Sequence, residues 1–150
     1  MLTIEPSLIL KAINCAENNI VITDVDGNIL WCNKHAIDFI GYSPDEILGK
    51  NANIIKHEST PQKLYKVMWD TIKNKKIKWR GKLKNKKKDG TTYVEELTIT
   101  PVLDDDGEIQ YFIGVQNDIT EIEELKEGIK EKIKQVREVV KKQLKNHENL

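Results

Sequence analysis

The sequence predicts an α+β domain followed by a long charged helix, and three patterns support this prediction. Residues 77–101 alternate between two kinds of side chain with the period of a β-hairpin. The residues before this hairpin carry repeated helix start and stop signals. From Thr120 onward the chain is highly charged, with a narrow apolar stripe at helical spacing. A chain of 150 residues with 39% apolar content suits one domain with one core and a helical appendage.

The charges argue against a nucleic-acid partner. The 24 Lys and Arg residues balance the 24 Asp and Glu residues, so the chain has no overall attraction to nucleic acid or to an anionic membrane. Ten basic residues and no acidic one lie between Lys73 and Lys88. Trp79 has the opposite phase to these lysines, whereas a groove for nucleic acid needs exposed aromatic residues among its basic ones. We interpret the basic residues as a solvated strand face.

Cysteine and histidine usage gives no sign of a disulfide framework or a metal site. Cys15 and Cys32 are far from CxxC spacing, and the three histidines, His35, His57 and His147, form no ligand pair. No apolar run is long enough to span a membrane, and no export segment is recognisable at the N-terminus. We expect a soluble, cytoplasmic protein.

The first elements are a helix and two short strands. Within the N-terminal segment 1–18, which we interpret as a helical cap, the apolar residues 8–15 predict a helix that ends near Asn18 and Asn19. Residues 20–23 and 28–32 are then predicted strands, separated by a tight Asp-Gly turn.

Three helical segments follow. Residues 33–40 have apolar residues at helical spacing and stop at a glycine. Residues 43–46 read Ser-Pro-Asp-Glu, which combines a capping serine, a proline at the first helical position and a capping-box glutamate. Residues 51–58 are polar and predicted to be irregular. The next helix is predicted to start with Thr60 as its cap and to run to Lys73. Its apolar stripe comprises Leu64, Val67, Met68 and Ile72, with Trp69 at the border.

The hairpin has one face that is hard to explain without a ligand. Its first strand alternates a basic set with a mainly apolar set. The basic set is Lys78, Arg80, Lys82, Lys84 and Lys86, and the other set is Ile77, Trp79, Gly81, Leu83 and Asn85. The return strand places Tyr93, Glu95, Leu97 and Ile99 on one face. Burying Asn85 and Glu95 without hydrogen bonds costs about 1–3 kcal/mol for a neutral group. We therefore expect something polar to meet them inside.

The last strand, residues 109–117, is apolar on both faces at its middle, so both faces need cover. One phase carries Tyr111, Ile113 and Val115, and the other carries Phe112, Gly114 and Gln116.

The final segment, residues 119–150, is predicted to be an amphipathic helix that pairs with its copy in a second chain. Its apolar residues form an eleven-residue repeat, which favours a straight or slightly right-handed seam. They are Ile122, Leu125, Ile129, Ile133, Val136, Val140 and Leu144. So polar a helix is marginal alone in water, and the alternative to pairing is packing back on the sheet. We expect a homodimer through this helix, with the N-terminal helix as a second contact.

Several short motifs resemble those of the PAS sensor domain. They lie at residues 21–24, 27–29, 41–43, 46–49, 88–91 and 116–120. The resemblance implies a PAS fold: a five-stranded antiparallel sheet with short helices on one face. It implies a core at residues 19–118 and a coiled-coil signalling helix at 119–150.

Further motifs are similar to those of flavin-binding redox sensors within this family, the aerotaxis receptor and the nitrogen-fixation regulator. They lie at residues 53–57, 68–69, 79–81 and 85–88. In such relatives the positions matching Trp69 and Asn85 line an FAD pocket, so the resemblance implies FAD. Where the aerotaxis pattern has an arginine and an aspartate around its histidine, this chain has Lys56 and Ser59.

Residues 97–101 and 114–116 resemble light-oxygen-voltage photoreceptors, which bind FMN, and FMN is therefore the second choice of cofactor. The photoreactive cysteine of those proteins would fall near Asn53. This segment has no cysteine, so we do not expect a photocycle that forms a covalent adduct.

An isoalloxazine ring has an amide-like polar edge and broad apolar faces, so its pocket needs inward amides and aromatic neighbours. The candidate cofactor-binding residues are Asn85, Gln116, Trp69, Trp79, His57, Asn53, Lys56 and Glu95. The alternatives are that the amides are simply satisfied in the core, that the tryptophans are core residues and that His57 is structural.

The sequence thus predicts a sensory domain that binds a flavin and relays its redox state, through the strand carrying Gln116, to the terminal helix. Two other functions stay open: a cofactor-free dimerisation module, and a PAS pocket for haem or a metabolite. Haem would need His57 as its axial ligand, because residues 60–73 contain no histidine. We expect no enzyme, since no nucleophile motif or phosphate loop is present. The downstream partner cannot be read from the sequence.

Overall fold

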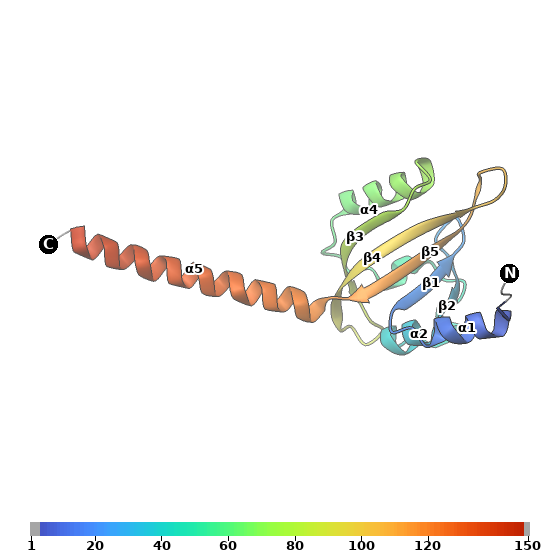
Figure 1. Cartoon of the computed structure of the whole chain (residues 1–150), viewed down its shortest axis with the longest axis horizontal. Helices are drawn as coiled ribbons and strands as arrows, with labels where there is room; N and C mark the ends of the chain where they lie inside the picture. Colours follow the sequence, from blue (N-terminus) through green and yellow to red (C-terminus); the bar gives the residue numbers. More distant parts are fainter. Residues whose placement is uncertain (1–3, 149–150) are drawn as a thin grey trace. The chain divides into compact units, whose positions relative to one another are not determined.

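The computed structural model describes residues 4–148 and divides into two compact units, one ending at Asp118 and the other beginning at Ile119. The first unit contains a five-stranded antiparallel sheet in the order β2-β1-β5-β4-β3 (Figure 1). The strands are β1 (Asn19–Thr23), β2 (Ile29–Cys32), β3 (Trp79–Lys86), β4 (Thr92–Leu103) and β5 (Ile109–Asp118). This confirms the predicted sheet.

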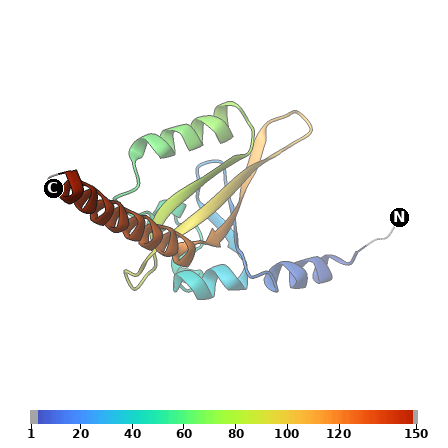
Figure 2. The same ribbon diagram turned by 60° about the vertical axis from the view of Figure 1, so that its left-hand side comes forward.

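The helices lie in the predicted regions of the chain, although some of their ends differ; α1 precedes β1 in the sequence, and the short helices lie between β2 and β3 (Figure 2). They are α1 (Pro6–Asn14), α2 (Lys34–Ile40), α3 (Pro44–Ile47), the 3₁₀ helix η1 (Ala52–Ile55), α4 (Gln62–Trp69), the π-helix η2 (Asp70–Asn74) and α5 (Thr120–Glu148). The capping glutamate of α3 behaves as predicted, because the backbone N–H of Ser43 donates to Glu46 Oε2 at 2.9 Å.

Two apolar clusters on the same sheet face form the core. One joins Met68 and Ile72 of the α4–η2 segment to inward residues of the last three strands. The other joins Val21 of β1 to residues of α2 and α3. Val21 is the register partner of Gly114, which places both clusters on one side of the sheet. The short helices therefore cover a single face.

The alternation predicted for the hairpin is confirmed from Trp79 onward, whereas Ile77, predicted to share the inner face, precedes β3 and is 55% exposed. Asn85 and Glu95 are buried, as is Gln116 on the neighbouring strand. The register pairs Leu97 with Gln116 and places Glu95 opposite Asp118, the last residue of β5. Three adjacent strands thus each contribute one polar side chain to the inner face.

Three predicted local features are wrong, and two of them involve hydrogen bonds to residues distant in the sequence. Helix α1 ends at Asn14, because Asn18 already uses its carbonyl to accept from the Asn33 amide. The polar stretch 51–58 is not wholly irregular, since Asn51 caps η1 by accepting from the Asn53 backbone N–H at 3.1 Å. Thr60 does not cap α4, because its hydroxyl donates to the Lys84 carbonyl on β3 at 2.8 Å.

The predicted stripe of α4 is also partly wrong, since Val67 is exposed. Met68 and Ile72 are buried and Leu64 packs against them, a spacing of four residues that selects one helical face. Val67 lies about 100° away from Met68 around the axis and faces outward. Beyond Trp69 the helix widens into the π turn of η2.

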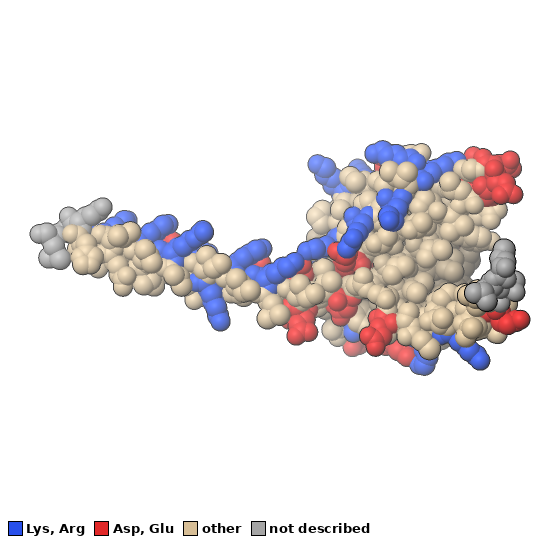
Figure 3. All heavy atoms as spheres, viewed as in Figure 1, with Lys and Arg blue, Asp and Glu red and all other residues tan. Residues whose placement is uncertain are grey.

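The second unit is the single helix α5, with apolar side chains exposed along its length. The stripe residues Ile122, Leu125, Ile129, Ile133, Val136, Val140 and Leu144 are each 47–62% exposed. Glu–Lys pairs three residues apart, such as Glu127 with Lys130 at 3.3 Å, add modest helix stabilisation. Figure 3 shows basic side chains along much of the helix. Among the described residues, no helix combines the length and apolarity that crossing a bilayer requires.

Asn33 ties the N-terminal elements to the sheet. Its side chain is fully buried, and its Oδ1 accepts from the backbone N–H groups of Ile20 (3.0 Å) and Ala36 (3.1 Å). Its Nδ2 donates to the carbonyls of Asn18 (2.9 Å) and Ile13 (3.2 Å). One amide therefore joins α1, β1 and α2.

Asn33→Ala should lower the free energy of unfolding by about 2–4 kcal/mol, because it removes a helix cap and leaves buried backbone groups unpaired. Urea denaturation followed by circular dichroism measures this. The control is Asn14→Ala, which removes one exposed hydrogen bond to the Lys34 N–H and should cost less than about 1 kcal/mol. Equal losses for the two variants would contradict this role of Asn33.

Candidate functional site

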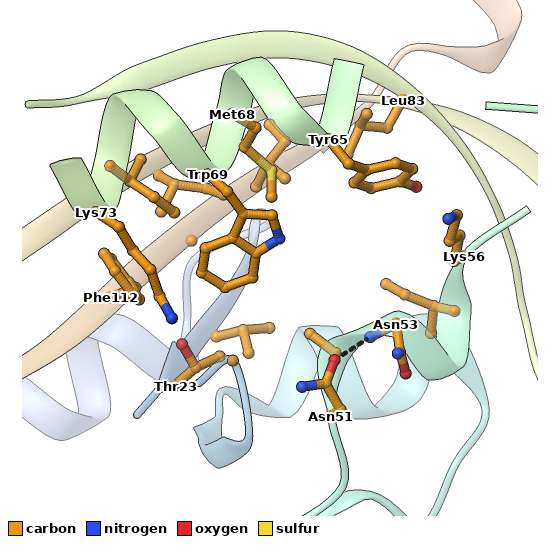
Figure 4. A pocket seen from close by; sticks show the side chains of 18 of the residues that line it. Thr23, Asn51, Asn53, Lys56, Tyr65, Met68, Trp69, Lys73, Leu83 and Phe112 are labelled. Carbon is orange, nitrogen blue, oxygen red and sulfur yellow. Dashed lines mark hydrogen bonds between the residues drawn. The ribbon is translucent and has the colours of Figure 1, made fainter. Parts of the chain in front are cut away.

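A cavity of about 820 Å³ lies between the inner face of the sheet and the segment that runs from η1 to η2 (Figure 4). Its walls come from β1, the three strands β3 to β5, η1, α4 and η2. This volume falls within the range of about 300–1,000 Å³ that small-molecule sites occupy.

The sheet wall of the cavity is polar at one end. Asn85 from β3, Glu95 from β4 and Gln116 from β5 all line it, beside the apolar Leu83 and Leu97. The amides can each donate and accept hydrogen bonds, so this wall suits the edge of a polar ring.

The opposite wall is aromatic. Trp69 and Tyr65 are on α4 and point into the hollow (Figure 4), and the Trp69 ring meets that of Phe112 edge to face, with centroids 5.9 Å apart. Gly27 has a φ of +85°, and a Cβ there would lie 3.2 Å from the Trp69 ring. This glycine lets the turn before β2 approach the indole. The wall offers flat apolar surface to a flat ligand.

Three lysines line the cavity: Lys66 is on α4, and Lys56 and Lys73 lie near its opposite ends. Lys56 Nζ lies 3.1 Å from Gln62 Oε1 and 4.3 Å from the centroid of the Tyr65 ring. Lys73 Nζ lies 4.9 Å from the Trp69 centroid and 3.7 Å from the Asp26 carboxylate. A ligand with an anionic tail would meet a cation at either end.

Glu95 is the most unusual group in the cavity. It is 1% exposed, and neither carboxylate oxygen has a hydrogen-bond partner. Its pKa is raised to about 8, mainly by burial; the nearby Asn85 amide opposes this shift, and the negative charge of Asp118 adds to it. An uncompensated buried charge is very costly, so the acid is protonated at neutral pH.

A second buried polar group lies next to this acid. The Tyr93 hydroxyl has no hydrogen-bond partner, and burial raises the pKa of Tyr93 above its ordinary value. The Tyr93 ring itself packs edge to face against Phe39, with centroids 4.9 Å apart.

Six of the eight predicted cofactor-binding residues line this cavity. They are Asn53, Lys56, Trp69, Asn85, Glu95 and Gln116. Trp79 does not line it: the residue is buried in the core, and its ring lies over Gly81, where a Cβ would come within 2.4 Å of it. His57 also lies outside the lining, with its Nδ1 2.7 Å from Ser59 Oγ.

Sequence reasoning missed several lining residues, notably Tyr65, Lys73 and Phe112. Tyr65 precedes Trp69 by one helical turn, a spacing that indicates a shared face of α4. Lys73 lies on the π turn, which no sequence signal announces. Within the described part of the chain, no group of His, Cys, Asp and Glu residues could hold a metal ion.

Comparison with known proteins gives consistent matches. A PAS domain family model matches residues 17–121. A nitrogen fixation regulatory protein from Klebsiella oxytoca is 33% identical over 115 residues, which cover 77% of this chain and 23% of that protein. A blue-light photoreceptor from Listeria monocytogenes is 35% identical over 116 residues, which cover 75% of this chain and 45% of that protein. The chain thus spans less than half the length of either relative.

A solved structure supports the fold. The PAS domain of a protein from Colwellia psychrerythraea superposes with a TM-score of 0.70 at 24% identity, covering 77% of this chain and 97% of that one. These matches confirm the resemblance that the short motifs indicated.

Glu95→Gln should stabilise the ligand-free protein relative to the wild type as the pH rises. The pKa of Glu95 is about 8 when folded, against an ordinary value of 4.5, so between these values the folded state binds more protons and wild-type stability falls with increasing pH. The glutamine cannot ionise. Denaturation at pH 5 and pH 8 should show the difference in free energy of unfolding between variant and wild type growing by a few kcal/mol, at about 1.4 kcal/mol per pH unit. A difference that does not change with pH would contradict a protonated Glu95.

Proposed function

Because the chain belongs to the PAS domain family, we propose that it is a sensory domain that binds a flavin in this cavity and passes the redox state of the flavin through β5 to α5. Its proposed role is binding and relay, not catalytic turnover. The relatives bear the names of a nitrogen fixation regulator and a blue-light photoreceptor, and both of these roles are sensory.

The shape and polarity of the cavity carry this proposal. One wall has three adjacent polar side chains, and the opposite wall has flat aromatic surface. An isoalloxazine ring needs this combination, because its faces are apolar and one edge carries alternating donors and acceptors. The unpartnered carboxyl of Glu95 supports the fit, since a guest would supply the missing partner.

The region around Lys56 favours FAD, with FMN as the second choice. A second hollow of about 660 Å³ shares Asn53, Lys56 and Gln62 with the cavity and continues past them to Lys86. A larger, dinucleotide cofactor could extend its phosphates and second base into this polar space. Lys56 and Lys86, which both line this hollow, would offer cations to such phosphates.

The cysteine positions favour redox sensing over adduct photochemistry. Cys15 is exposed, and burial raises the pKa of the Cys32 thiol to about 11. Neither thiol lines the cavity. A bound flavin would therefore have no thiol beside its ring.

Gln116 is the proposed start of the relay. A flavin supplies reversible redox chemistry that changes which ring-edge atoms accept or donate hydrogen bonds. The Gln116 side chain can rotate by half a turn, which presents its carbonyl oxygen in place of its NH₂ group, or the reverse. One hydrogen bond is worth about 0.5–1.5 kcal/mol, so this turn would bias a two-state equilibrium about two- to tenfold.

The proposed output is pairing of α5 with its copy in a second chain. Thr120 begins α5 only four residues after Gln116, so a shift of β5 reaches the helix through the backbone. The exposed apolar stripe of α5 could pack against the same stripe of a second copy. The exposed side chains of Leu8, Ile9 and Leu10 on α1 offer a second self-association surface.

Gly114→Val should place a side chain in the cavity and weaken flavin binding about five- to 150-fold. A Cβ at Gly114 would lie in ordinary contact with Leu97, 3.5 Å away, so the fold should tolerate it, and valine suits a strand. Overpacking by one side chain costs about 1–3 kcal/mol, and 1.4 kcal/mol is tenfold in affinity. Fluorescence titration with FAD, FMN and riboflavin measures the effect.

The matched control is Gly128→Ala on α5, which should bind as the wild type does. A wild-type protein that binds none of the three flavins would contradict the proposal. That outcome would favour the cofactor-free dimerisation module, or a pocket for another ligand.

Gln116→Leu should retain flavin but lose the response of α5 to redox state. With both native cysteines replaced by serine and Ile129 replaced by cysteine, crosslinking between copies with a bismaleimide, which needs no oxidant, reports α5 pairing. In the wild-type background the crosslinking yield should differ about two- to tenfold between oxidised and reduced flavin. In Gln116→Leu the yield should be the same in both redox states. Gln110→Leu, at an exposed position of the same strand, is the control. An unchanged redox response in Gln116→Leu would refute this route.

A further inference from the structure

We propose that Glu95 is a specificity-determining residue of the cavity: its carboxyl group stays protonated and pairs with an imide edge of the ligand, that is, a ring N–H next to a carbonyl. The acid would donate its O–H to the ligand carbonyl and accept from the ring N–H. This inference rests on the proposed function and deepens it by assigning the ligand edge that the site selects.

Glu95 is a buried cavity residue that lacks hydrogen-bond partners. The side chain lines the cavity, both oxygens lack partners, and only 1% of the residue is exposed. A buried carboxyl group without partners destabilises the fold unless a ligand supplies the missing hydrogen bonds. Its neighbours across the strands, Asn85 and Gln116, line the same end of the cavity.

The groups around Glu95 favour its neutral form. Asp118, its register partner on β5, disfavours ionisation, and the hydroxyl of Tyr93 on β4 is neutral. On α4 the neutral Tyr65 faces the acid, and Lys66 also lines the cavity. The ammonium of Lys56, after η1, is held over the Tyr65 ring and near Gln62. None of these groups forms an ion pair with Glu95, so the neutral acid is the favoured form.

The neutral acid recognises a different ligand from the anion. A protonated carboxyl offers one donor and one acceptor side by side, which matches the N–H and C=O of an imide. A carboxylate offers acceptors only and would repel the ligand carbonyl. The site should thus select planar heterocycles with an imide edge, and ionisation of Glu95 should weaken them. The isoalloxazine of a flavin has such an edge.

The test is titration with riboflavin, which lacks a phosphate and so does not report on the lysines. Wild-type affinity should be constant from pH 6 to 7 and fall about tenfold by pH 9, because only about one tenth of the acid is then neutral. Glu95→Gln keeps a donor and an acceptor but cannot ionise, and should bind within about threefold of the wild type at pH 6, with no decline at pH 9. Glu95→Leu should bind at least about tenfold more weakly at pH 6.

Glu96→Gln is the matched control, because Glu96 is the adjacent residue, pairs with Arg80 and does not line the cavity. It should keep the wild-type pH profile. Should Glu95→Gln fail to fold, calorimetry on the wild type at pH 8 in two buffers of different ionisation enthalpy gives a second measurement. Riboflavin binding should then take up about half a proton per site, because half of the acid is ionised beforehand.

The two proposals fail in different ways. If wild-type protein binds no flavin at any pH, the proposed function fails and the role of Glu95 fails with it. If wild-type protein binds flavin but shares its pH profile with Glu95→Gln, or takes up no proton, only the role of Glu95 is overturned. Equal affinity of Glu95→Leu and wild type at pH 6 would overturn it as well.

Discussion

A buried polar group needs a partner, and this requirement governs the inner face of the sheet. Three adjacent strands each place one polar side chain on that face, and one of the three, Glu95, has no partner for either oxygen. Each unsatisfied buried group costs about 1–3 kcal/mol, so a fold that only needed a core would have apolar residues there. The helices between β2 and β3 cover the same face yet leave a hollow of about 820 Å³ beside it. The proposed ligand would account for both the hollow and the polar wall.

In the proposed relay, the position of the polar wall connects ligand recognition with signal output. Gln116 and the register partner of Glu95, Asp118, both lie at the end of β5. The chain leaves the sheet immediately afterwards and becomes α5. A change in hydrogen bonding at the ligand edge therefore acts on the last residues of the core, where strand and helix are covalently continuous. Few intermediate elements are needed between the bound molecule and the helix.

Strict alternation made the inner face of the hairpin predictable, because a period of two assigns Asn85 and Glu95 without knowledge of the rest of the fold. The same rule could not separate the two tryptophans, since burial does not distinguish a core residue from a cavity wall. The Trp79 ring packs over Gly81 in the core, whereas the Trp69 ring lines the cavity. The prediction that Thr60 caps α4 is wrong because its hydroxyl bonds to β3 instead. Local capping rules do not take such tertiary partners into account. The role of Lys73 depends on a π turn that has no sequence signature.

The central claim is that the hollow holds a flavin, and native mass spectrometry of the protein as purified tests it most directly. The account predicts a species heavier than the chain by one FAD, or by one FMN, per copy, with a yellow solution that loses the bound mass on heating. A colourless protein with the mass of the chain alone, unchanged after incubation with either flavin, would contradict it.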